Sequence, residues 1–194
     1  MFERTQAKMI LTGRNAGQFL QEAMGKQRAF AGGIYTKITC DESGTPRLYE
    51  LFPAAAAADE SGYTGECFID FRGGKPVHNT EVFRGTGVRL LQEAMYYPVC
   101  MFDELGSFDM IVPEFMEALR QYIYTGPPCL MHLLSLSEGE LMRRRLGLSL
   151  KYTAQLAKLQ EELKKADGVL LLDTDKISER KRKRLLDIWQ ERYL

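Results

Sequence analysis

The stretch KMILTGRNAGQFLQEAM, residues 8–24, decides the fold: an apolar run leads through a polar turn with two glycines into a helix. Backbone N–H groups at the start of a helix attract an anion, and glycines let the chain approach a phosphate closely. The segment therefore predicts a strand, a turn and a helix, in which the turn could bind a phosphate or, taken alone, could equally be a plain connection. The candidate phosphate-binding residues are Gly13, Arg14, Asn15, Ala16, Gly17 and Gln18.

Two side chains that normally bind a triphosphate are missing from this turn. Such loops carry a Lys that reaches the outer phosphates, followed by a Ser or Thr whose hydroxyl binds magnesium. In a loop one residue shorter than usual, Gln18 and Phe19 take those positions; in the full-length pattern they fall on Phe19 and Leu20. We expect a tight turn, with Phe19 buried in the core. The lost contacts weaken triphosphate binding by about 3–6 kcal/mol.

A second pattern, VCMFDELGSFDM (99–110), places Asp103 and Glu104 after an apolar run. Beside a phosphate loop, the first acid of such a pair holds the metal shell and the second orients or deprotonates a water. Alone, the pattern fits a solvated strand end equally well. Because a phosphate site needs both motifs at the carboxyl ends of parallel strands, we expect Gly13 and Asp103 at the same edge of one sheet.

The rest of the chain alternates between apolar runs and amphipathic segments. Residues 31–53 and 66–83 indicate two hairpins, and strand and helix alternate from residue 98 onward. The predicted fold class is α/β: a three-layer sandwich with a mostly parallel sheet, helices on both faces and β-hairpins in the first half. We expect one domain over residues 1–194. The later helices are expected at 87–96, 113–124 and 137–166, and after Ser178.

Four segments in order along the chain resemble the P-loop nucleoside-triphosphatases related to the thermostable and cancer-related nucleoside-triphosphatases. They are ILTGR (10–14), GGIYT (32–36), FDELGSFDMIVPEF (102–115) and CLMH (129–132). This resemblance implies a P-loop fold and hydrolysis of nucleoside triphosphates, with Mg²⁺ and ATP or GTP as ligands.

The resemblance also implies roles for single residues. Gly13, Arg14 and Gly17 would line the phosphate loop, and Asp103 would serve the metal. Glu104 would be the catalytic residue that acts on water. His132 would be an accessory residue, at a strand end that faces the site.

Two further groups are candidate accessory residues. Arg143, Arg144 and Arg145 could close over phosphates from a lid, or could form an ordinary solvated helix face. Asp173 and Thr174 follow the last strand, where a nucleotide base often lies in P-loop folds, but they could equally form a polar loop before a helix.

Composition bears on partners and location. Lys plus Arg and Asp plus Glu both number 26, so a zero net charge argues against nucleic acid or a membrane as a partner. No apolar run approaches the roughly 20 residues of a membrane span, and MFERTQAKMI (1–10) lacks the apolar centre of a signal peptide. The four cysteines are expected to be buried and reduced, and no zinc or haem site is apparent. We expect a cytoplasmic protein.

The C-terminal sequence SERKRKRLLDIWQERYL (178–194) predicts an amphipathic helix, with Leu185, Trp189 and Tyr193 toward the core. Its basic face is expected to be solvated, although it could contact an acidic protein partner.

Three functional hypotheses follow from the sequence. The first is a P-loop protein with a degraded loop, weak or no hydrolysis and a nucleotide-binding role. The second is an active magnesium-dependent nucleoside-triphosphatase or kinase-like enzyme that uses Arg14 or one of residues 143–145 as a substitute cation. The third is a scaffold that binds an unknown protein and no nucleotide.

Overall fold

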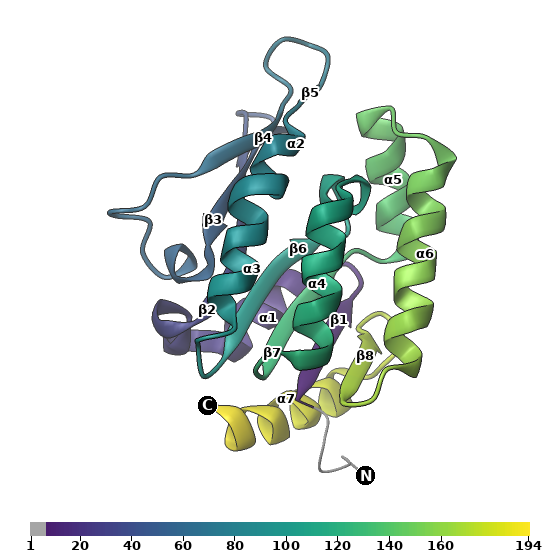
Figure 1. The fold of residues 1–194 in the computed structure, drawn as a ribbon. Coiled ribbons are helices and arrows are strands. Elements are labelled where there is room, and N and C mark those ends of the chain that lie inside the picture. The colour runs from purple at the N-terminus through teal and green to yellow at the C-terminus, as the bar shows by residue number, and fades with distance from the viewer. Residues whose placement is uncertain (1–6) are drawn as a thin grey trace.

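The structure, a computed structural model, describes residues 7–194; residues 1–6, on which the signal-peptide expectation partly rests, lie outside the described part. One eight-stranded sheet runs through the molecule in the order β5-β4-β3-β2-β6-β7-β1-β8 (Figure 1). The strands are β1 (Lys8–Thr12), β2 (Gly32–Cys40), β3 (Pro46–Pro53), β4 (Glu66–Asp70), β5 (Val77–His78), β6 (Cys100–Leu105), β7 (Cys129–Leu133) and β8 (Val169–Asp173).

The sheet has a parallel half and an antiparallel half. Strand β1 lies parallel to β7 on one side and to β8 on the other, and β7, β6 and β2 continue the parallel part. From β2 through β3 and β4 to β5, each strand is antiparallel to the next. All five residues of β1 are buried, as expected for a parallel strand covered on both faces. The predicted α/β class, with hairpins in the first half, is confirmed.

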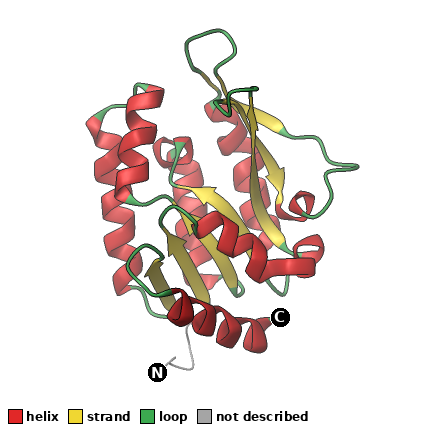
Figure 2. Ribbon diagram, turned by 180° about the vertical axis from the view of Figure 1, so that it is seen from behind, coloured by secondary structure: helices red, strands yellow, loops and turns green. Residues whose placement is uncertain are grey.

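Helices cover both faces of the sheet. They are α1 (Ala16–Met24), α2 (Thr80–Val82), α3 (Val88–Ala94), α4 (Pro113–Thr125), α5 (Leu136–Leu146), α6 (Leu150–Lys165) and α7 (Glu179–Tyr193). Short 3₁₀ segments lie at Gly25–Phe30, Ala54–Ala57 and Phe108–Ile111, and a π-helical turn at Phe83–Gly87. Helices α3 to α6 lie in front of the sheet in Figure 1. Figure 2, seen from behind, shows α7, which ends at the C-terminus, on the opposite face.

Alternate side chains of β1 enter two separate cores. Met9 and Leu11 belong to the cluster that contains Leu20 of α1 and Trp189 of α7. Ile10 points to the other face, into the cluster formed with α3 to α6. This alternation fixes the register of the strand that carries the phosphate-loop sequence, because a slip of one residue would exchange the two faces.

The structure refines several sequence-based expectations. Residues 137–166 are largely helical, as expected, but they form two helices, because Gly147 adopts a left-handed conformation (φ 66°) and ends α5. The second hairpin is short, since the chain becomes helical at Thr80. In α7, Leu185, Trp189 and Tyr193 face the core as expected: Trp189 is fully buried, and the other two pack against the same cluster while partly buried. Leu186, which the sequence pattern did not single out, is also buried.

The described helices include none that is both long and apolar enough to cross a membrane.

Candidate functional site

The phosphate-loop sequence forms a tight turn between β1 and α1. Gly13 has a φ of 105°, which favours glycine, and its carbonyl accepts a hydrogen bond from the N–H of Ala16 at 2.9 Å. Asn15 is the N-cap residue of α1, but its side chain makes no capping hydrogen bond. Only three residues therefore join the strand to the helix, as the tight-turn prediction requires, and the start of α1 keeps unpaired N–H groups.

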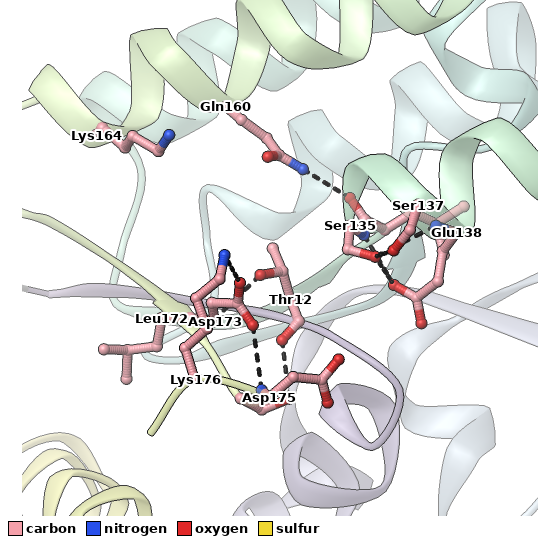
Figure 3. Close-up of polar contacts among 12 residues, drawn as sticks. Thr12, Ser135, Ser137, Glu138, Gln160, Lys164, Leu172, Asp173, Asp175 and Lys176 are labelled. Atoms are coloured by element: carbon pink, nitrogen blue, oxygen red, sulfur yellow. Dashed lines mark hydrogen bonds and ion pairs between the residues drawn. The ribbon is translucent and has the colours of Figure 1, made fainter. Parts of the chain in front are cut away.

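The start of the turn packs against the loop that follows β8. The backbone N–H and the hydroxyl of Thr174 both donate to the carbonyl of Thr12, each at 2.8 Å. A Cβ placed on Gly13 would lie 2.7 Å from the Thr174 hydroxyl oxygen and 3.2 Å from a carboxylate oxygen of Asp175. Figure 3 shows the Asp175 side chain extending toward the turn. A carboxylate beside the turn opposes the binding of a phosphate there.

The two positions that replace the Lys and the hydroxyl residue face elsewhere. The Gln18 amide donates to Glu22 at 2.7 Å on the exposed side of α1. Phe19 is only half-buried, and the guanidinium carbon of Arg182 lies 3.3 Å from its ring centroid. The expectation that Phe19 enters the core holds in part: the ring packs against the core cluster that contains Leu20 and Trp189, but it stays half-buried at the edge of that core, with Arg182 of α7 stacked on it.

Asp103 lies at the same edge of the sheet as Gly13, on β6, with β7 between β6 and β1. The prediction of parallel strands with both motifs at one edge is confirmed. Asp103 is 6% exposed, and both of its carboxylate oxygens have partners: Gln21 Nε2 donates to Oδ2 at 2.9 Å, and His132 Nδ1 lies 3.3 Å from Oδ1.

Gly17 makes this cluster possible. A Cβ at Gly17 would lie 3.1 Å from His132 Nδ1 and 3.2 Å from Asp103 Oδ1, so a larger residue would push both side chains apart. The other ring nitrogen of His132, Nε2, is buried and has no hydrogen-bond partner among the described residues. Our reading of the sequence missed Gln21, although it lies four residues after Gly17 on the same helix face.

Asp103 is a poor direct ligand for magnesium in this arrangement. A Mg²⁺ ion at such a site takes one or two carboxylates together with phosphate oxygens and water, and the P-loop pattern adds a hydroxyl. Here Asp103 already accepts from Gln21 and faces His132, and Phe19 stands at the hydroxyl position. Within residues 7–194, no group of three or more His, Cys, Asp or Glu side chains is placed to hold a metal.

Glu104 occupies a distorted point of β6. It has a φ of 58°, and the pairing with β7 shifts between Phe102 and Leu105, so the acid pair lies within the strand rather than after it. Burial is the main reason why its pKa is raised, to about 7; His132 opposes the rise, and Asp103 and other nearby carboxylates add to it. A carboxyl group with such a pKa can take up or release a proton near neutral pH.

Beside Glu104 lies an open hollow of about 330 Å³. It is lined by Arg14, Glu104, His132, Leu134, Glu138, Leu141, Met142 and Arg145. Arg14 is exposed and makes no hydrogen bond or ion pair with any other residue in the described range 7–194. The hollow therefore brings together a free cation from the turn, the raised-pKa carboxyl of Glu104 and the unpartnered nitrogen of His132.

The other candidate arginines are tied to protein groups. Arg143 and Arg144 both donate to Glu140, each at 2.8 Å. Arg145 reaches the hollow, but its guanidinium donates to the carbonyl of Pro46 and the hydroxyl of Tyr49. Arg145 thus joins α5 to β3.

Asp173 lines a second hollow of about 290 Å³, between the end of β8 and the helices α5 and α6 (Figure 3), and Thr174 follows Asp173 in the chain. Its two lysines have carboxylate partners: Lys176 pairs with Asp173 at 2.5 Å, and Lys164 with Glu161 at 2.6 Å. The Thr174 hydroxyl is also used, since it donates to the main chain of β1. These contacts account for both candidate residues without a ligand.

Comparison with known proteins places this geometry in a wider context. No protein-family model matches the sequence, and no curated protein matches it. Among solved structures, the fold resembles that of THEP1 from the hyperthermophile Aquifex aeolicus, with a TM-score of 0.55 over 93% of this chain and 95% of that chain. This chain has a P-loop NTPase-like fold. Because the two sequences share 14% identity, the similarity establishes the fold alone, and the chemistry of the site rests on the residues described above.

Proposed function

We propose that this protein is a single-domain P-loop-like protein that binds a nucleotide weakly and hydrolyses it slowly or not at all. The observation that carries the proposal is the Gln21–Asp103–His132 cluster, which uses both oxygens of the carboxylate that would otherwise serve magnesium. Phosphoryl transfer depends on positioned positive charge. The loop has no lysine, and Gln18, which stands at the lysine position, is bonded to Glu22. The loop therefore offers a phosphate only its N–H groups and Arg14.

The expected binding mode follows from the polarity of the turn. The free N–H groups at the start of α1 attract the phosphates, and Arg14 adds a formal charge at the hollow. The carboxylate of Asp175, which lies beside Gly13, repels phosphates and so opposes the attraction by the N–H groups and by Arg14. With the lysine and metal contacts missing, we expect a Kd for ATP or GTP on the order of 0.1–1 mM.

Calorimetric titration of the whole chain with ATP and with GTP tests this proposal. Arg14→Ala should weaken binding by about tenfold or more, since it removes a charge-assisted hydrogen bond. The matched control is Arg89→Ala, which removes an exposed arginine from α3, where it pairs with Glu93. The proposed site would be contradicted if the wild-type protein showed no heat of binding, or if both substitutions weakened binding equally.

The alternative is an active hydrolase, and one specific observation favours it. Arg14 and Glu104 line the same hollow, and the Glu104 pKa of about 7 suits a base that accepts a proton from water at neutral pH. A phosphate-release assay on the wild-type protein and Glu104→Gln separates the two functions. Turnover that disappears in Glu104→Gln, while ATP binding persists, would establish the hydrolase; no release from either protein supports the binding role.

A further inference from the structure

A stripe of four charged side chains runs along the outer surface of α7. Arg180, Arg184, Asp187 and Glu191 recur at intervals of four, three and four residues, which places them within about 60° of one another around the helix axis. All four are exposed. The two arginines occupy the first half of the helix and the two acids the second half, so the stripe carries a positive end and a negative end.

This order of charges is unfavourable for a lone helix. Arg180 and Arg184 are like charges four residues apart, as are Asp187 and Glu191, and such pairs repel. Within the stripe, only Arg184 and Asp187, three residues apart, are opposite charges at a favourable spacing. The arginines also lie toward the positive end of the helix dipole and the acids toward its negative end. None of the four forms an ion pair or hydrogen bond with another side chain in the described residues 7–194.

The stripe is, however, complementary to a second copy of itself. If two α7 helices lie antiparallel, Arg180 faces the partner's Glu191 and Arg184 faces the partner's Asp187. In both pairs, the midpoint between the two residue numbers falls between Leu185 and Leu186. A single two-fold axis at that level of the helix therefore forms each pair twice, which gives four ion pairs in all. We propose that this face of α7 is a homodimer interface, in which two chains pack α7 against α7 in antiparallel orientation.

Within the stripe, the balance of two positive and two negative charges favours a second copy over a polyanion, although the exposed Lys181 and Lys183 lie beside it. A nucleic acid or an acidic surface would be attracted by Arg180 and Arg184 but repelled by Asp187 and Glu191 on the same stripe. The apolar side of α7 is already used, since Leu186 and Trp189 are buried against the sheet. The interface is therefore mainly electrostatic and small, below about 1,200 Å², which makes the dimer reversible and sensitive to salt.

Sedimentation equilibrium of the full chain tests this interface. The wild-type protein should show a concentration-dependent dimer at an ionic strength of about 0.01 M and should dissociate toward monomer at about 0.5 M. Arg184→Asp alone and Asp187→Arg alone each turn two attractive pairs into repulsive ones, so each should weaken dimerisation by about tenfold or more. The double variant R184D/D187R restores opposite charges across the two-fold axis and should recover dimerisation.

Two controls separate this mechanism from a general charge effect. Lys151→Asp changes the net charge as much as Arg184→Asp but lies on α6, on the other side of the sheet, and should leave the dimer unchanged. A second exchange, R180E/E191R, should behave like the first. A wild-type protein that stays monomeric at low salt, a dimer indifferent to the single reversals, or exchanged variants that fail to recover would each overturn the proposal.

Discussion

Replacing Glu104 with Gln should stabilise the protein at alkaline pH and change its stability little at acidic pH. Burial raises the pKa of this carboxyl from 4.5 to about 7 in the folded state. The folded state therefore holds a proton that the unfolded chain has released, so Glu104 costs the wild-type protein stability progressively as pH rises from about 4.5 through about 7. Glutamine carries no charge and avoids this cost.

The size of the effect follows from the displacement of the pKa. A rise from 4.5 to about 7 corresponds to about 3 kcal/mol, and screening by water in the adjoining hollow reduces this to about 2–3 kcal/mol at pH 8. At pH 5 the same relation gives less than about 1 kcal/mol. Asp109, whose pKa burial raises to about 6, is present in both proteins, so only its interaction with the Glu104 charge enters the difference.

Urea unfolding of both proteins at pH 5 and pH 8 measures this difference. The matched control is Glu117→Gln, the same chemical change at an exposed position of α4, which should alter stability by less than about 0.5 kcal/mol at either pH. If Glu104→Gln changed stability equally at both pH values, Glu104 would not be a half-buried carboxyl with a raised pKa, and the description of its environment would be wrong.

Three further substitutions test the packing around the site. Gly33→Ala should destabilise the protein by at least about 2 kcal/mol in urea unfolding, because its Cβ would lie 2.2 Å from the Met101 carbonyl at a φ of 106°; Gly73→Ala, with open space around it, is the neutral control. Gln21→Ala should cost about 1.5–3 kcal/mol by removing a hydrogen bond from the buried Asp103 carboxylate, and an unchanged midpoint would show that this bond is unimportant. Gly17→Ala should also lower the midpoint, by about 1 kcal/mol or more, because its Cβ crowds Asp103 and the neighbouring histidine; a neutral result would mean that this contact relaxes freely.

The sequence was most informative where a local pattern and the fold require the same conformation. The strand at 8–12, the turn at Gly13 and the strand leading to Asp103 were each predictable, because apolar runs and glycine restrict the chain strongly. Ser178, after which the last helix was expected, is the N-cap residue of that helix. The break at Gly147 was missed, since an isolated glycine in a helical pattern does not by itself end a helix.

The contacts of the site were less predictable, because they depend on segments far apart in the chain. Nothing near Asp103 indicates that Gln21, 82 residues earlier, would bond to its carboxylate. The position of Asp175 beside the phosphate turn likewise results from β8 pairing with β1. The distortion at Glu104 requires the pairing of β6 with β7, which no local pattern encodes.

The magnesium dependence of ATP binding tests the central claim most directly. If Gln21 and His132 occupy the Asp103 carboxylate, the metal gains no protein ligand there, and calorimetry with excess magnesium or with EDTA should give Kd values within about threefold of each other. A phosphate-release assay under the magnesium condition should show slow turnover or none. Affinity that rises by about tenfold or more with magnesium, together with phosphate release that Glu104→Gln abolishes, would contradict the account and show a working metal site.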